Sequence, residues 1–325
     1  MTRQRILVTG ASGCIGHYLA EALIQETDHE IFLLVRNPDK LKLDIKAYPH
    51  VTILQADLRE IEQFSAILQT IHCAVLAATS WGGAQEVFEV NVTKTVQLVS
   101  LLNPEVCQQV IYFSTASILD PRQELLKEAG EIGTDYIRSK YVCLQQLSQL
   151  ELAPRIITLF PTLVFGGDGQ KPYSHLSAGL PEIMRWINLA RFLKTEGSFH
   201  FIHSRDIAQV VTYLINHPDT QVSERLVLGN QELSVNQCIE AMCAHLNKRI
   251  YFRLNLSFWL ANLIITLFQI QMAPWDRFCM NYRYFSYQNP VNPSSFGLAT
   301  YCPTISDLLR VSGISPYSAS VIPRG

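Results

Sequence analysis

Tyr136 and Lys140 are a pair of side chains whose types and spacing could do chemistry together. They stand four residues apart in a stretch, 136–150, whose apolar periodicity predicts a helix, so both would lie on one face. A free phenol has a pKa of about 10 and is a poor acid–base catalyst at neutral pH, but a neighbouring cation favours the phenolate. The pair therefore predicts proton transfer by Tyr136, although the same spacing also arises on ordinary amphipathic helices.

A cluster of hydroxyl groups, Ser114, Thr115 and Ser117, follows a predicted strand at 110–113. The loop at the carboxyl end of a parallel strand can present such groups to a ligand held in the crevice of the sheet. A hydroxyl in that place could orient a carbonyl group. A serine or threonine at a strand end is common, so the order of the motifs along the chain carries more weight than any one of them.

A glycine-rich loop, Thr9-Gly-Ala-Ser-Gly-Cys-Ile-Gly16, lies between the first predicted strand and a predicted helix. Gly10 permits the tight turn, Gly13 lets the backbone approach a phosphate, and Gly16 lets the helix pack closely on the strand. The backbone amides and the helix N-terminus can then hold the pyrophosphate of a dinucleotide. Glycine turns are common, and it is the position at the first strand-to-helix turn that makes this one informative.

The second predicted strand ends at Arg36, where NAD-specific proteins usually place a carboxylate against the ribose hydroxyls. A guanidinium suits a 2′-phosphate and Lys40 is close in sequence, which favours NADP over NAD; the alternative is a solvated loop arginine. Asp57, after the third strand, suits the adenine edge or an ordinary helix N-cap. The full set of residues expected to bind the cofactor is Gly10, Ser12, Gly13, Cys14, Ile15, Gly16, Arg36, Asp57, Leu58, Ala77, Ala78, Tyr136, Lys140 and Pro161.

Apolar runs of strand length alternate with longer periodic stretches, which is a βαβ pattern. Because these runs are continuous rather than alternating, the strands should be covered on both faces. We expect an α/β protein with a Rossmann doubly wound parallel sheet in residues 1–165, rejoined by 199–228, and a smaller, mostly helical C-terminal substrate-binding lobe in 166–325. The predicted strands are 6–9, 31–35, 51–54, 74–77, 110–113 and 156–159.

The composition excludes several classes of protein. Hydrophobic residues make up 48% and charged residues 17%, which argues against disorder, and the formal net charge of −2 gives no attraction to nucleic acid. The eight cysteines contain no Cys-x-x-Cys pair, and Cys238, Cys243 and His245 fit the core of a helix, so we expect no metal site. The N-terminus has no secretory pattern, and a cytoplasmic location is expected.

The segment 256–270 is nearly continuous apolar sequence, interrupted by Asn262 and Gln269. A membrane-spanning helix needs about 20 apolar residues, so this run is short for a span. A buried or substrate-lining helix is the first interpretation, with peripheral membrane contact and a true span as alternatives.

Together these motifs resemble the extended short-chain dehydrogenase/reductases, in particular the branch of dihydroflavonol reductase and 3β-hydroxysteroid dehydrogenase. Asn91-Val-Thr-Lys-Thr95 is similar to the Asn-Val-x-Gly-Thr helix of that family, with Lys94 in place of glycine. Leu159-Phe-Pro-Thr-Leu-Val-Phe-Gly166 is similar to its Arg-Pro-x-x-x-Tyr-Gly stretch, with Phe160 in place of arginine. Phe201-Ile-His-Ser-Arg-Asp206 matches its Phe-x-His-Val-x-Asp segment.

The resemblance implies roles for three residues: Tyr136 as proton donor or acceptor, Lys140 as its pKa-lowering partner, and Thr115 as the hydroxyl that polarises the substrate carbonyl, with Ser114 and Ser117 as substitutes. The expected enzyme is an NAD(P)-dependent oxidoreductase of the ketoreductase or alcohol dehydrogenase type, moving hydride between the nicotinamide and an apolar small molecule. A homodimer is also implied.

Two alternatives to that activity remain open. Relatives that act on nucleotide sugars carry an Arg-Asp pair just before the Phe-x-His segment, where this chain has Ser198, which puts a nucleotide-sugar epimerase or dehydratase second. Arg185, Arg191 or Lys194 could supply the missing charge. A non-catalytic NAD(P)-binding scaffold, or a protein of the membrane surface, is the third interpretation.

Overall fold

A seven-stranded sheet, entirely parallel, organises the N-terminal part of the molecule, in the order β11-β6-β5-β4-β1-β2-β3. We describe a computed structural model that covers residues 3–316 except 219, 221, 258, 260, 261, 263, 264, 266, 268 and 270. The α/β Rossmann fold expected from the sequence is confirmed. The strands are β1 (Arg5–Thr9), β2 (Glu30–Val35), β3 (Val51–Gln55), β4 (Cys73–Leu76), β5 (Gln109–Phe113), β6 (Ile156–Pro161) and β11 (Arg225–Leu228).

The six predicted strands all occur in this sheet, with ends that agree to within two residues. Most of their side chains are buried because helices cover both faces, as the continuous apolar runs require, whereas the edge strand β3 buries only Leu54. The seventh strand, β11, has no counterpart among the predicted strands. Its apolar run is only Leu226–Leu228, too short to stand out from a loop, and its place is set by pairing with β6.

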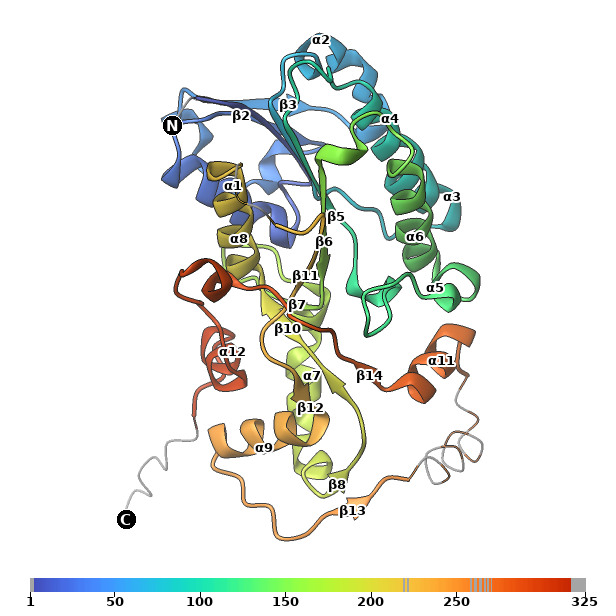
Figure 1. Ribbon diagram of the computed structural model, residues 1–325. Helices are drawn as coiled ribbons and strands as arrows, with labels where there is room; N and C mark the ends of the chain where they lie inside the picture. Colours follow the sequence, from blue (N-terminus) through green and yellow to red (C-terminus); the bar gives the residue numbers. More distant parts are fainter. Residues whose placement is uncertain are drawn as a thin grey trace, which may run out of the picture.

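Helices lie on both faces of the sheet, as Figure 1 shows. Helices α1 (Cys14–Glu26) and α8 (Ser204–Asn216) cover one face, and α3 (Ala84–Phe88), α4 (Thr95–Ser100) and α6 (Asp135–Leu147) cover the other. Between α3 and α4 the chain forms a π-helix, Glu89–Lys94. The predicted helix at 136–150 is therefore present as α6, which ends three residues earlier.

The C-terminal lobe combines helices with short strand pairs. Its helices are α7 (His175–Ala190), α9 (Val235–His245), α11 (Pro274–Tyr282) and α12 (Ile305–Val311). Its strands are β7 (Leu163–Phe165), β8 (Leu193–Lys194), β9 (Ser198–Phe199), β10 (Phe201–His203), β12 (Leu233–Ser234), β13 (Leu254–Asn255) and β14 (Tyr284–Phe285). The expected helix at 256–270 falls mostly outside the described residues.

Within the part of the chain that the structure describes, no helix combines the length and the apolar character needed to cross a membrane.

Two contacts fasten the last part of the chain to the sheet. Val291 donates its backbone N–H to Val227 O and accepts one from Gly229, so it covers the outer edge of β11. The fully buried carboxylate of Asp206, on α8, accepts the backbone N–H groups of Tyr301 and Cys302 at 2.6 and 3.1 Å. The sheet and the end of the chain are therefore tied to each other.

His203 ends β10 and caps α8, because its Nδ1 accepts the backbone N–H of Arg205 at 3.1 Å. The ring is buried between Tyr18 and Tyr301. Burial, and then the charge of Arg205, lowers the pKa of His203 to about 4. The imidazole is thus neutral at pH 7, which matches its role as a hydrogen-bond acceptor.

We expect the free energy of unfolding to depend less on pH below pH 6.5 in the His203→Asn variant than in the wild type. Because the pKa of His203 falls from 6.5 to about 4 on folding, the folded state loses stability as the pH drops through that window, by up to about 3 kcal/mol. Asparagine keeps the helix cap and does not titrate. Urea unfolding of both proteins at pH 7 and pH 4.5 measures the difference.

The comparison of wild type and variant separates the titration of His203 from that of Asp206, which is present in both proteins. Burial raises the pKa of Asp206 to about 6, which works in the opposite sense between pH 3.8 and 6 in both proteins. An equal loss of stability on acidification in wild type and variant would contradict the assignment.

Candidate functional site

At two of its three glycines, the loop of 9–16 is built by backbone approaches that leave no room for a side chain. A Cβ atom on Gly10, whose φ is +73°, would lie 2.6 Å from Ala78 N, and one on Gly16 would lie 2.1 Å from Gly10 O. A Cβ on Gly13 would meet only Gly10 O, at 3.3 Å, and would otherwise point into open space. Helix α1 begins directly after Gly13, so its free N–H groups and the positive end of its dipole face that space.

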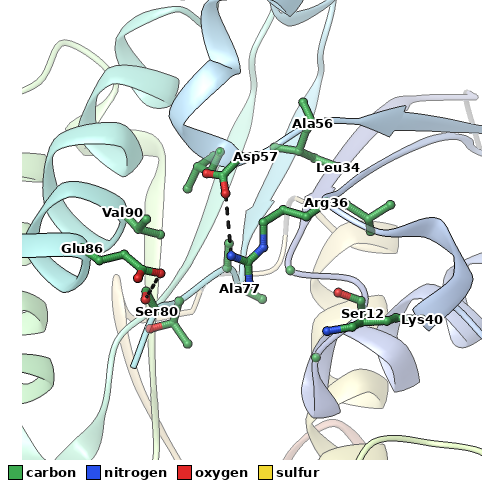
Figure 2. A pocket seen from close by; sticks show the side chains of 16 residues that line it. Ser12, Leu34, Arg36, Lys40, Ala56, Asp57, Ala77, Ser80, Glu86 and Val90 are labelled. Atoms are coloured by element: carbon green, nitrogen blue, oxygen red, sulfur yellow. Dashed lines mark hydrogen bonds and ion pairs between the residues drawn. The ribbon is translucent and has the colours of Figure 1, made fainter. Parts of the chain in front are cut away.

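A cavity of about 290 Å³ opens in front of this loop, at the carboxyl ends of β1, β2 and β4 (Figure 2). Eight of the predicted cofactor residues line it: Gly10, Ser12, Gly13, Arg36, Asp57, Leu58, Ala77 and Ala78. The sequence did not indicate Leu34, Val35, Ala56, Thr79, Ser80, Glu86 and Val90, which also line it. The carboxyl end of a parallel sheet, where the strand order reverses between β1 and β4, is where such folds bind ligands.

Arg36 and Lys40 bring positive charge to this cavity, as Figure 2 shows. Arg36 is largely exposed and forms a long ion pair, 3.7 Å, with Asp57. Asp57 is at the same time the N-cap of the 3₁₀ helix Leu58–Phe64 and pairs with Arg59 at 3.0 Å. Hydrogen bonds from Arg59 hold the pKa of the Asp57 carboxyl below its usual value. Asp57 is therefore both a helix cap and part of the cavity wall.

The predicted catalytic residues lie together between β5 and α6. The Thr115 side chain is close enough to Tyr136 to lower the pKa of the phenol, and its hydroxyl donates to the Ser117 hydroxyl at 3.3 Å. The Lys140 ammonium is buried and donates to the backbone carbonyl of Phe113 at 2.8 Å, and it lies 5.9 Å from the centre of the Tyr136 ring. One turn of α6 thus presents a phenol and an ammonium to the end of β5.

Burial governs the electrostatics of this pair. It raises the pKa of Tyr136, partly offset by the side chain of Thr115, and it lowers the pKa of Lys140 to about 8. The sequence suggested that Lys140 would lower the pKa of Tyr136. In the structure desolvation outweighs that effect, because the ammonium is directed at the Phe113 carbonyl rather than at the phenol.

The remaining predicted cofactor residues do not line the cavity. Cys14, Ile15 and Gly16 form the first turn of α1 behind the loop, and the Cys14 thiol lies 3.2 Å from the Ser204 hydroxyl. Tyr136, Lys140 and Pro161, at the end of β6, belong to the neighbouring catalytic region.

A comparison with protein-family models finds one match over residues 6–229, to the NAD dependent epimerase/dehydratase family. The chain belongs to this family. The match covers more than half of the sequence, including the glycine loop and all three proposed catalytic residues, so the resemblance to extended short-chain dehydrogenase/reductases is confirmed. No curated protein matches the chain in sequence.

Several solved structures share the fold. A UDP-glucose 4-epimerase from Stenotrophomonas maltophila, with NAD and formylated UDP-arabinopyranose, has a TM-score of 0.63 at 18% identity, over 95% of this chain and 97% of its own. WbmG of Bordetella bronchiseptica, with NAD and UDP, has a TM-score of 0.64 at 13% identity, over 99% and 100%. A UDP-glucuronic acid 4-epimerase variant from Bacillus cereus, with NAD and a fluorinated UDP-sugar, has a TM-score of 0.62 at 18% identity, over 95% and 98%.

Both departures from the motifs of this family are accommodated without disturbing the fold. Lys94 ends the π-helix and reaches Glu62, with a nitrogen-to-oxygen distance of 2.8 Å. Phe160 is completely buried in β6, where it fills part of a core shared with Trp275 and Tyr287. The Phe160 position therefore contributes packing rather than charge.

Asn91, within the family's Asn-Val motif, links the wall of the first cavity to helix α6 by hydrogen bonds. This fully buried side chain accepts the backbone N–H of Ser80 at 2.7 Å and the Thr79 hydroxyl at 3.2 Å, and it donates to Ser139, next to Lys140, at 3.1 Å. The sequence indicated Asn91 as a motif residue without predicting these partners. Through them a single amide joins the loop after β4 to α6.

Trp81 is a site residue that the sequence did not indicate. Its indole stacks on the ring of Tyr136, with centroids 3.8 Å apart and planes 19° from parallel, and it meets His175 of α7 edge-on. More than half of Trp81 is exposed. It forms an aromatic wall over the phenol, and no local pattern could have predicted that contact.

A second cavity, about 750 Å³, lies in the C-terminal lobe along β8, β9 and β13. Lys194 and Arg283 both line it, together with Ser198, Glu232 and Asn236. Ser198 stands opposite Tyr284 in the β9–β14 pair, so Arg283 is one residue away from the position facing that serine. The cavity therefore has two cations although the family arginine before the Phe-x-His segment is missing. Two carboxylates, Glu196 and Glu232, also line it, and Glu196 pairs with Arg283 at 2.8 Å.

The cysteines and histidines considered as metal ligands pack in the core. Cys238 and Cys243 are buried in α9, His245 bonds the Ile314 carbonyl, and His200 bonds the Asn230 carbonyl and the Tyr287 N–H. Among the residues described, no group of three or more His, Cys, Asp or Glu side chains could hold a metal ion.

Gly16→Ala and Gly13→Ala should separate the two kinds of glycine in the loop. The methyl group at 16 would overlap the Gly10 carbonyl, a backbone atom that cannot step aside, so we expect the melting temperature to fall by several degrees without any ligand. The methyl at 13 meets only the Gly10 carbonyl oxygen, at 3.3 Å, so a much smaller loss of stability is expected. Thermal unfolding by circular dichroism measures both, and equal losses would contradict this account.

Proposed function

We propose that this protein oxidises and reduces a carbon–oxygen centre of a nucleoside-diphosphate sugar, with Tyr136 as the acid–base group and a bound nicotinamide dinucleotide as the hydride carrier. The observation that carries the proposal is the pairing of a dinucleotide-type cavity with a Thr115–Tyr136–Lys140 cluster in a chain of the epimerase/dehydratase family. The identity of the substrate class rests on the second cavity.

The residues present fit a dinucleotide. Gly10 and Gly16 already occupy the closest backbone approaches, and Gly13 leaves the space in front of the α1 N-terminus open for a phosphate. Ala77 and Ala78 keep the cavity clear of long side chains on the β4 side. When bound, the nicotinamide accepts or returns a hydride, and its oxidised ring adds a positive charge beside the catalytic cluster.

The chain's own residues handle the proton and the orientation. Tyr136 would take the proton of a substrate hydroxyl as the carbon is oxidised and give it back on reduction, while Thr115 holds the reacting oxygen. Lys140 is fixed by the Phe113 carbonyl and retains further N–H groups to bind a ribose hydroxyl. Desolvation by Trp81 strengthens each of these interactions.

The second cavity supports a nucleotide-sugar substrate. Lys194 suits a diphosphate, as does Arg283 once it exchanges its ion pair with Glu196 for the ligand. The serine and asparagine side chains of the cavity suit sugar or base edges. Tyr287, two residues after the end of β14, joins this lobe to the catalytic loop by donating its hydroxyl to the Ala116 carbonyl at 2.6 Å. This bond fastens the segment that follows β14 to the residue next to Thr115.

Trp81 favours a second candidate, reduction of an apolar carbonyl compound. An exposed indole stacked on the acid–base tyrosine would pack against a flat apolar substrate at least as well as against a sugar. In that case reduced cofactor is consumed in proportion to product, whereas an epimerase returns the hydride and consumes none.

Tyr136→Phe should lower turnover by about 10²- to 10⁴-fold while leaving nucleotide binding intact, because it removes one hydroxyl and keeps the ring under Trp81. Substrates are tested in two panels. UDP- and dTDP-sugars are incubated with NAD and their products are separated by chromatography. Apolar ketones are incubated with NADPH, whose consumption is measured by absorbance.

Tyr141→Phe, on the same helix but packed against Gly130, is the matched control and should be as active as wild type. Conversion of ketones alone would replace the first candidate by the second. Full activity of Tyr136→Phe on a substrate that wild type converts would remove the mechanism for both.

Arg36 supports a preference for NADP over NAD. We expect Arg36→Ser to weaken NADP binding by about 10- to 100-fold, since a charge-assisted bond to phosphate is lost, and to leave NAD binding nearly unchanged. Arg36→Lys should lie in between. Calorimetric titration with both dinucleotides gives the ratio of the two dissociation constants. Tighter binding of NAD than of NADP by the wild type would show that Arg36 pairs with Asp57 rather than with a 2′-phosphate.

A further inference from the structure

Helix α7 exposes large apolar side chains although its opposite side is already buried. Leu180 and Ile187 pack into the lobe, while Ile183, Trp186 and Leu189 are 46%, 57% and 56% exposed. A helix on the surface of a protein normally turns polar residues to water on the side away from the core. An apolar stripe on that outer side indicates that something else covers it.

A second segment places more apolar side chains beside the end of this helix. Tyr251, Phe252 and Leu254 are 73%, 58% and 61% exposed. The contacts between the two segments are direct, because Phe252 stacks on Phe192, β13 pairs with β8, and Arg191 bonds the Arg249 carbonyl. We call this surface the lobe-end patch; its apolar members are Ile183, Trp186, Leu189, Tyr251, Phe252 and Leu254.

The charges within the lobe-end patch are mostly positive. Three carboxylates, Glu182, Glu196 and Glu240, accompany six cations on or beside its two segments, and Glu182 and Glu240 pair with two of those cations, Arg185 and Arg253. The other four cations are Arg191, Lys194, Lys248 and Arg249. The sequence from 241 to 275 contains three of these cations and no aspartate or glutamate. In a chain whose net charge is −2, this local excess of positive charge stands out.

We propose that the lobe-end patch binds the surface of a membrane that contains anionic lipids. Tryptophan and tyrosine prefer the level of the lipid headgroups, leucine and phenylalanine enter the acyl boundary, and arginine and lysine attract anionic headgroups. The patch offers all three kinds of side chain on one surface. A second copy of the chain is a poorer occupant, because a two-fold interface would set these cations against each other.

The position of the lobe-end patch leaves the nucleotide-binding end free. In Figure 1, β8 and β13 lie at the far end of the C-terminal lobe, away from β1, β2 and β3. The second cavity shares Lys194 and Asn255 with β8 and β13. Membrane binding would therefore place that cavity close to the lipid surface.

Cosedimentation of the full chain with vesicles tests the proposal. Vesicles of phosphatidylcholine alone are compared with vesicles that also contain phosphatidylglycerol. We expect binding to the anionic vesicles, weaker binding to the neutral ones, and loss of binding in high salt. The triple variant Trp186→Gln, Leu189→Gln, Tyr251→Gln should bind the anionic vesicles at least tenfold more weakly, and Lys248→Gln with Arg249→Gln should have a similar effect.

The control variant carries Ile132→Gln and Leu298→Gln, which are exposed apolar residues outside the lobe-end patch, and it should bind vesicles as wild type does. Unchanged dinucleotide binding and melting temperature show that each variant is folded. Wild-type vesicle binding by the triple variant would overturn the proposal. So would a dimer, seen by sedimentation velocity, that the triple variant abolishes, because the patch would then belong to a second copy. The outcome does not depend on which substrate the enzyme takes.

Discussion

At Gly10 the backbone of the first strand-to-helix turn lies against the backbone of Ala77 and Ala78, with no space for a Cβ atom. The contact is reinforced from the side, since the Ala78 N–H donates to the Thr9 hydroxyl at 3.2 Å. This approach fixes the ends of β1 and β4 relative to each other, and the cavity, the start of α1 and the loop that carries Trp81 all take their positions from it. Asn91 then extends the same positioning to α6.

Removal of water determines the chemistry of the neighbouring cluster. A partly buried phenol and a buried ammonium each favour the neutral form, which is why the pKa of Tyr136 rises while that of Lys140 falls to about 8. In the proposed mechanism, the phenolate that takes the substrate proton would therefore be stabilised by charge that arrives with the ligand.

Features that depend on local sequence were predictable. The sheet follows from apolar runs of strand length, the loop at 9–16 from its glycine spacing, and eight cavity residues from their positions after predicted strands. Contacts between distant segments were not. Trp81 on Tyr136, the Lys140 bond to Phe113, and Arg283 beside Ser198 each join residues that only the fold brings together. The arginine missing before the Phe-x-His segment says little about the charge of the second cavity, because that cavity draws its cations from several segments.

The covering of β11 by Val291, and the two N–H groups that Asp206 receives from Tyr301 and Cys302, have a consequence for biosynthesis. A nascent chain that ends before residue 291 already contains all seven strands of the sheet. However, the outer edge of β11 is still open, and the Asp206 carboxylate still lacks these two N–H donors. Open strand edges recruit other strands. The ribosome-bound protein should therefore be vulnerable to aggregation until the last elements emerge, and chaperone engagement would be most valuable during that interval.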